Sequence, residues 1–193
     1  AIRDYQLLVG EAFALARCAC GYAINLRSET QVKEYLYDIA KFPVQKSGKR
    51  KAAGSKSSGQ SSDQDAINAL RMAVMERIDG GADMFLESCA LHGYAFATMN
   101  TYLYGLCKSV YELVEPDEEA RKRKAKKARE DLRSRSVTIE DVCERVYPDV
   151  SQHTQANGRW SWTDPPMTGV PKSLHHIFVP DPGTAWLIYD YKR

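Results

Sequence analysis

The sequence has almost no net charge and none of the short motifs that mark common enzymes. Its 27 lysine and arginine residues nearly balance 25 aspartate and glutamate residues, for a formal net charge of +2. The overall charge therefore neither favours nor excludes a polyanionic partner. C-x-x-C, H-E-x-x-H, G-x-S-x-G, P-loop and G-x-G-x-x-G patterns are all missing, so the usual metal, nucleophile and nucleotide templates do not apply. We expect no metal, no cofactor and no enzyme activity.

Cysteine is scarce, and its number is odd. Most of the five cysteines lie within apolar helical patterns, where a free thiol behaves as a small hydrophobic side chain. This usage favours a reducing compartment, so we expect the cytoplasm, or the nucleus if the host is a eukaryote. The cysteines are Cys18, Cys20, Cys89, Cys107 and Cys143.

Only one long stretch has no formal charge. It runs for twenty residues from Ser88 to Cys107, which is long enough in principle to cross a bilayer. The stretch also contains His92, Asn100 and three tyrosines, a polar load that a membrane helix rarely carries. We therefore interpret it as a buried helix of a protein that does not enter the membrane.

Apolar residues recur at three- and four-residue spacing along the first two thirds of the chain. The spacing predicts helices over 2–26, from Ser28 to before Pro43, over 63–79, and without interruption over 82–114. The last of these is apolar nearly all round, which is typical of a helix surrounded by others. The expected fold is mainly α, a helical bundle around this long apolar helix.

The last 46 residues change in character, with frequent proline and glycine and clustered β-formers. A short helix of about ten residues from Thr138 precedes them. Strand candidates are 160–163, 174–179 and 185–191, and Asp181 to Thr184 suits a type II turn between the last two. We expect a small C-terminal β-hairpin or sheet element.

These patterns divide the chain into four segments. The first, 1–45, is an expected helical hairpin, and 46–62 is a basic, Ser- and Gly-rich stretch that cannot bury enough surface to order itself, so we expect a flexible loop. The third, 63–147, is the helical core and includes a basic helix over 116–135. The fourth, 148–193, is the C-terminal loop and hairpin region.

Positive charge is concentrated in segments 46–56 and 121–135. In the second, nine of fifteen residues are Lys or Arg, and only Glu130 and Asp131 oppose them. Cations spaced along a helix can neutralise successive phosphates and give salt-sensitive, sequence-independent affinity for nucleic acid. The predicted phosphate contacts are Lys49, Arg50, Lys51, Lys56, Arg121, Lys122, Arg123, Lys124, Lys126, Lys127, Arg129, Arg133 and Arg135.

Each of these features also has a plainer interpretation. The basic helix is also what a solvated helix with i, i+4 ion pairs looks like, although pairs from Glu118 and Glu119 would occupy only two of the nine cations. Trp160 and Trp162 are candidates for stacking on unpaired bases, but two tryptophans two residues apart on a strand more often close a small core.

The sequence thus predicts a non-enzymatic nucleic-acid-associated binding protein that contacts either DNA or RNA. An interaction or assembly protein is the alternative, for example a viral coat subunit or an inhibitor of a host complex, with a protein partner or a homo-oligomer. A hydrolase-type enzyme that uses His175 or His176 is the least favoured hypothesis, because adjacent residues on a strand point to opposite faces.

Overall fold

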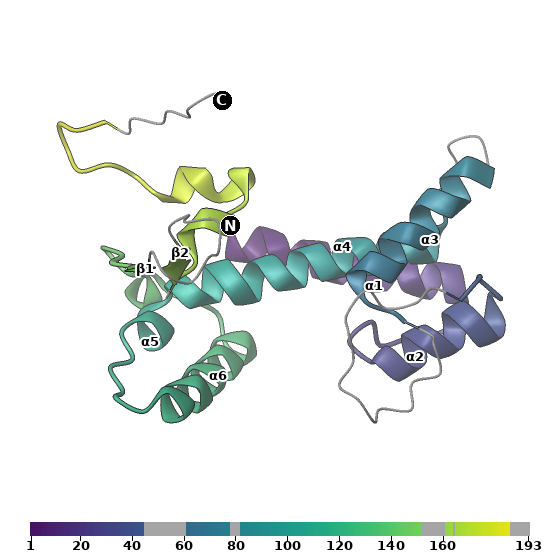
Figure 1. The fold of residues 1–193 in the computed structure, drawn as a ribbon, viewed down its shortest axis with the longest axis horizontal. Coiled ribbons are helices and arrows are strands. Elements are labelled where there is room, and N and C mark those ends of the chain that lie inside the picture. The colour runs from purple at the N-terminus through teal and green to yellow at the C-terminus, as the bar shows by residue number, and fades with distance from the viewer. Residues whose placement is uncertain (45–60, 78–81, 152–160, 164, 186–193) are drawn as a thin grey trace. The chain divides into compact units, whose positions relative to one another are not determined.

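A computed structural model of the chain describes residues 1–44, 61–77, 82–151, 161–163 and 165–185 (Figure 1). It is mainly helical, with one two-stranded antiparallel sheet near the C-terminus, and this confirms the predicted fold class. In the described residues no helix is both long enough and apolar enough to cross a bilayer. The chain forms two compact units, Ile2–Leu103 and Tyr104–Arg193, with Ala1 counted in the second.

The described residues of the first unit form four α-helices, two of which continue as π-helical turns. Ser28 begins the second helix as predicted, because its hydroxyl accepts a hydrogen bond from the Gln31 N–H at 3.4 Å. Asp63 begins the third helix by accepting the Ala66 N–H at 2.9 Å. The elements are α1 (Ile2–Cys20), α2 (Glu29–Lys33) with the π-helix η1 (Glu34–Ile39), α3 (Gln64–Arg77), and α4 (Met84–Thr98) with the π-helix η2 (Met99–Leu103).

The core of this unit lies where α1 runs beside α4 (Figure 1). Ala12 and Ala16 of α1 are completely buried, and their small side chains let the two helices approach closely. Leu36, Leu70 and Phe85 bring η1, α3 and α4 into the same cluster. Ser61, near the end of the segment 46–62 that is predicted to be a flexible loop, is buried as well. Residues 46–60 of that segment lie outside the described part of the chain.

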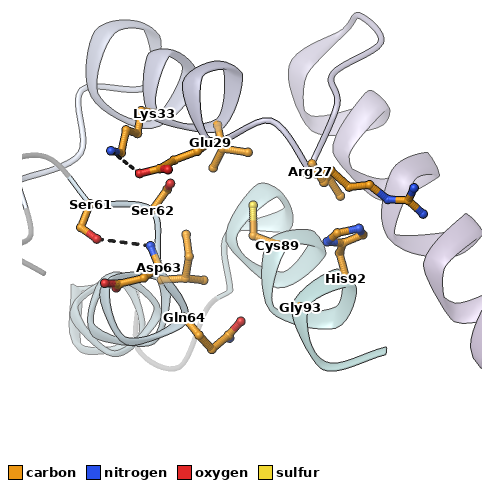
Figure 2. A pocket seen from close by; sticks show the side chains of 13 residues that line it. Arg27, Glu29, Lys33, Ser61, Ser62, Asp63, Gln64, Cys89, His92 and Gly93 are labelled. Atoms are coloured by element: carbon orange, nitrogen blue, oxygen red, sulfur yellow. Dashed lines mark hydrogen bonds and ion pairs between the residues drawn. The ribbon is translucent and has the colours of Figure 1, made fainter. Parts of the chain in front are cut away.

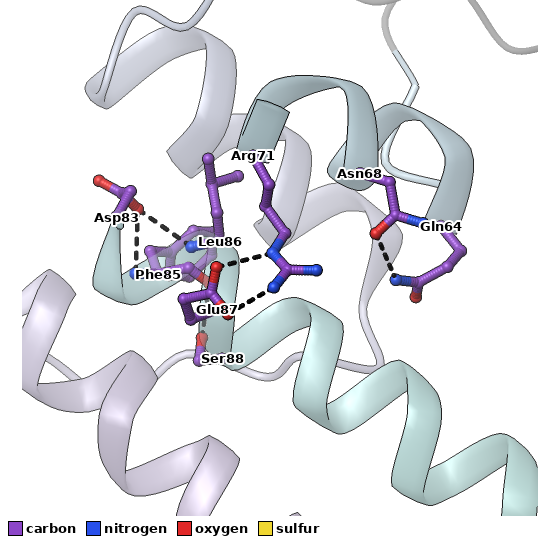
Figure 3. Close-up of polar contacts among 8 residues, drawn as sticks. All are labelled: Gln64, Asn68, Arg71, Asp83, Phe85, Leu86, Glu87 and Ser88. Carbon is purple, nitrogen blue, oxygen red and sulfur yellow. Dashed lines mark hydrogen bonds and ion pairs between the residues drawn. The ribbon is translucent and has the colours of Figure 1, made fainter. Parts of the chain in front are cut away.

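Two polar arrangements fix the start of α4 (Figure 3). The Asp83 carboxylate accepts hydrogen bonds from the N–H groups of Phe85 and Leu86, each at 3.0 Å. One turn later, the Arg71 guanidinium of α3 donates two hydrogen bonds of 2.7 Å to the Glu87 carboxylate. A bidentate pair of this kind fixes direction as well as distance, so it sets how α3 lies on α4.

The long helix predicted over 82–114 is interrupted in the structure. After α4 the chain passes through the π turn η2 and the 3-10 turn η3 (Tyr104–Leu106) before the short α5 (Lys108–Tyr111). The Asn100 side chain donates to the Phe96 carbonyl at 2.8 Å, and Cys107 adopts an extended conformation with ψ of 141°. Side-chain bonds to the backbone compete with the helical ladder, and hydropathy does not reveal that competition.

Where the structure describes the second unit, it has one helix of several turns, α6 (Glu118–Ser134), and a small sheet. The sheet pairs β1 (Asp149–Ser151) with β2 (Ser161–Thr163), so that Val150 lies opposite Trp162. The helix predicted from Thr138 is only the 3-10 turn η4 (Ile139–Asp141). The remaining turns are the 3-10 helices η5 (Met167–Gly169) and η6 (Lys172–Ile177).

The predicted terminal hairpin needs a correction. Its first arm, 174–179, is not a strand, because most of it lies in the 3-10 helix η6, which follows Pro171. The turn itself is confirmed: Gly183 has φ of +82°, and the Thr184 N–H donates to the Asp181 carbonyl at 3.0 Å. Most of the second arm, 186–191, lies outside the described residues.

His92 of α4 is a buried polar residue in the apolar interior of the first unit. Its side chain is 6% exposed, and its ring stacks on Phe96 and meets the edge of Phe13, with both centroid distances 5.4 Å. The Nε2 atom has no hydrogen-bond partner among the described residues. Burial, and next the positive charge of Arg27, lower the pKa of His92, so the ring is held in its neutral form.

The neutral state of His92 predicts how stability depends on pH. A histidine whose pKa is lower in the folded state stabilises the fold fully above its unfolded pKa near 6.5, and the contribution is lost as the pH falls below that value. Wild-type protein should lose more stability than His92→Phe between pH 7.5 and pH 5, measured by urea unfolding followed by circular dichroism. Equal losses in the two proteins would contradict this assignment.

Candidate nucleic-acid interface

The basic helix α6 starts and ends at defined caps. Asp117 precedes its first turn and accepts the Glu119 N–H at 3.1 Å. Acidic residues are favoured at this position, because they cap the free N–H groups of the helix N-terminus and complement its dipole. Along one side, Leu132 is completely buried, while Ala125 and Ala128 are half-buried. This apolar side packs against α5 and η3, so the opposite side of α6 faces solvent.

Three cations on the solvent side carry no ion pair with any described residue. They are Arg123, Lys126 and Lys127, and all three side chains are exposed. Residues three and four apart on a helix project from the same face, so these groups form one short basic strip. Glu130 projects from that face as well and is exposed. We call Arg123, Lys126 and Lys127 the open strip.

Two other lysines of α6 are already paired with acids. Lys122 lies 2.7 Å from the Glu118 carboxylate and 3.9 Å from that of Glu119. The hydrogen bond that Glu118 accepts from Lys122 lowers the pKa of the Glu118 carboxyl. Lys124 forms an ion pair with Glu115, which precedes the helix. Surface ion pairs of this kind are weak, but they still reduce the positive charge that α6 offers to a polyanion.

Arg135, a predicted phosphate contact, is instead part of the structure that ends α6. Its guanidinium donates two hydrogen bonds, of 2.8 and 2.7 Å, to the Asp141 carboxylate. Asp141 also accepts the Thr138 N–H at 2.8 Å, and the pair with Arg135 holds the pKa of this carboxyl well below its ordinary value. The Arg135 side chain therefore closes the turn after α6 and is not an open cation.

The other three arginines of α6 are less available to an outside phosphate than the three side chains of the open strip. Arg121 and Arg129 are half-buried, and the Nε atom of Arg129 is buried without a partner among the described residues. Arg121 and Arg133 each interact with another group of the protein. The structure therefore separates nine cations that look alike in the sequence into paired, packed and open groups.

Several predicted site residues lie elsewhere or outside the described residues. Trp162 is half-buried in β2. His175 and His176 are exposed in η6, where the His175 ring lies 3.2 Å from the Val170 carbonyl. In the part of the chain that the structure describes, no three His, Cys, Asp or Glu side chains lie close enough to hold a metal ion. Lys49, Arg50, Lys51, Lys56 and Trp160 lie outside the described residues.

Several solved structures are similar to this chain, and one of them is a polymerase domain. No protein-family model and no curated protein matches the chain. Among solved structures, the chain is similar to the POL domain of Pol1 from M. smegmatis in complex with DNA primer-template and dNTP. The TM-score is 0.48 and the sequence identity 18%, with 88% of this chain covered. The chain spans only 22% of the polymerase chain.

This finding contradicts the predicted function. The sequence predicted a non-enzymatic binding protein, whereas the similar structure is a domain of a polymerase. The alternatives of a coat subunit, an inhibitor of a host complex or a hydrolase gain no support from it.

The packing of α6 predicts which substitution disturbs the open strip indirectly. Leu132→Ala removes a completely buried side chain and should destabilise the packing of α6 by about 2–5 kcal/mol. Amide hydrogen exchange across 118–134 should become faster in this variant. Lys127→Ala, on the exposed side of the same helix, is the matched control and should leave exchange nearly unchanged. Similar exchange in both variants would show that Leu132 does not anchor α6.

Proposed function

We propose that this chain belongs to a nucleic-acid-acting protein, in which the open strip of α6 contacts the phosphate backbone. The observation that supports this proposal most directly is the lack of ion pairs at Arg123, Lys126 and Lys127 among the described residues, although acids are frequent nearby. An exposed cation without an internal partner can bind a phosphate at little cost in free energy, because no ion pair within the protein has to be broken first.

The geometry of α6 suits contact with consecutive phosphates. Arg123 and Lys127 are four residues apart, and their Cβ atoms are therefore about 5–6 Å apart along one face. Lys126 lies between them on the same side. A guanidinium and two ammonium groups at this spacing can each neutralise a phosphate and release its counterion.

The composition of α6 favours positioning over sequence recognition. Between Glu118 and Ser134 the helix has no aromatic, asparagine or glutamine side chain. The helix therefore has no aromatic ring to stack on a base and no side-chain amide to bind adenine with two hydrogen bonds. Phosphate contacts fix the register of a protein on nucleic acid but carry no sequence information directly.

The salt dependence of binding tests the proposal. The polymerase structure above contains DNA primer-template, so the probe is a fluorescent primer-template duplex in an anisotropy titration over a range of salt concentrations. Substituting Arg123→Gln, Lys126→Gln and Lys127→Gln together should weaken binding. The slope of log K against log salt should become shallower by roughly 3, since each lost phosphate contact removes about one unit.

A matched triple variant controls for the change in net charge. Lys33→Gln, Arg145→Gln and Lys172→Gln also remove three charges, and two of these cations are already paired, with Glu29 and Asp181. This control should keep the wild-type slope. Equal weakening in both triple variants, or no measurable binding at low ionic strength, would rule out the open strip as the contact surface.

A further inference from the structure

The first unit contains a pocket that the nucleic-acid proposal does not use. It has a volume of about 540 Å³, is open on one side, and is lined by α2, the start of α3, one side of α4 and the segment before α2 (Figure 2). That volume lies within the range of small-molecule sites, about 300–1,000 Å³. Cys89 and His92 both belong to the α4 wall, three residues apart on one face of the helix.

Much of the pocket wall is apolar. Leu26, Val32 and Ile67 contribute aliphatic side chains from three different segments, and all three are buried. Burial raises the pKa of the Cys89 thiol to about 12, so this group is neutral at physiological pH and adds to the apolar surface. A ligand must therefore have apolar faces to gain from entering.

The formal charges around the pocket are already engaged. Lys33 and Glu29 form an ion pair of 2.5 Å, and the Asp63 carboxylate accepts the Ala66 N–H. The Arg27 guanidinium lies over the Phe96 ring at 4.8 Å. Glu29 and Asp63 balance Arg27 and Lys33, so the charged side chains around the pocket sum to zero and favour neither an anion nor a cation overall.

Two buried polar side chains in the wall have hydrogen-bonding capacity to spare. The Nε2 atom of His92 has no hydrogen-bond partner among the described residues, and in the neutral ring this nitrogen can donate or accept according to the tautomer. Ser61 is 6% exposed, and its hydroxyl oxygen accepts the Asp63 N–H at 3.3 Å; a serine hydroxyl can in addition donate its own proton to a ligand. Buried polar groups of this kind cost free energy until a partner arrives.

We propose that this pocket binds a small uncharged heteroaromatic molecule. Such a ring combines apolar faces, which suit the aliphatic side chains and Cys89, with a polar edge for His92 and Ser61. A charged ring would lack a counter-charge, and a hydrocarbon ring would leave the two polar side chains unpaired. The site lies within the first unit and is independent of the open strip.

Adenine, which is neutral at pH 7.5, is the probe for this site. Titration followed by NMR of the histidine ring protons should show a saturable shift of the His92 signal. Toluene, a ring without a polar edge, and benzoate, a charged ring, should each bind at least about tenfold more weakly, the ratio expected when one hydrogen bond or charge is left unmatched.

Two variants test the polar edge. His92→Phe keeps the stacked ring, removes a buried nitrogen that lacks a partner, and should lower adenine affinity about tenfold, measured by calorimetry. Ser61→Ala tests the second polar group. It replaces His92→Phe as the test if circular dichroism shows that His92→Phe alters the fold. His175→Phe, an exposed histidine of the second unit, is the control and should bind adenine as wild type does.

The outcomes separate clearly. Saturable adenine binding that weakens in both pocket variants and persists in the control supports the proposal. It is overturned if adenine causes no saturable shift, if toluene binds as tightly as adenine, or if both pocket variants retain wild-type affinity. Because the open strip is intact in these variants, their binding to primer-template should not change, and failure of one proposal leaves the other standing.

Discussion

The close packing of α1 against α4 is the contact on which the first unit depends. Ala12 and Ala16 allow it because they present almost no side chain at the interface. The Tyr35 ring packs on Phe85 at 4.1 Å, while its hydroxyl donates to the Ala19 carbonyl at 3.3 Å, so one side chain joins η1 to both helices. Larger residues at the two alanine positions would separate α1 from α4 and loosen every element that packs on them.

This packing also explains why a polar ring is tolerated in the interior. His92 lies between Phe13 of α1 and Phe96 of α4, and the aromatic contacts offset part of the cost of desolvating it. The Arg27 cation also lies over the Phe96 ring. Of the two helices that bury His92, α4 also forms one wall of the neighbouring pocket, so the position of that wall follows from the core.

Helix starts could be predicted from the sequence. Positions where side-chain hydrogen bonds or a proline compete with regular backbone hydrogen bonding could not. Ser28, Asp63 and the acids before α6 mark helix starts because capping acts within one turn. At the break after Thr98 the Asn100 side chain bonds to the Phe96 carbonyl, and the 3-10 helix over 172–177 follows Pro171; the apolar pattern reveals neither feature. Hydropathy continues smoothly across the first and favours a strand in the second.

The candidate sites show the same division. Counting charges correctly located α6 as the most basic helix, but a count cannot tell Arg123 from Arg135, because only the folded chain shows that Asp141 holds the latter. Conversely, the sequence pattern indicated only that His92 lies in an apolar helix, and it suggested no binding role for this residue. Its spare hydrogen-bonding capacity becomes visible only once its neighbours are known to be carbon atoms. In both cases, a polar side chain is available to an outside partner to the extent that its own chain leaves it unmatched.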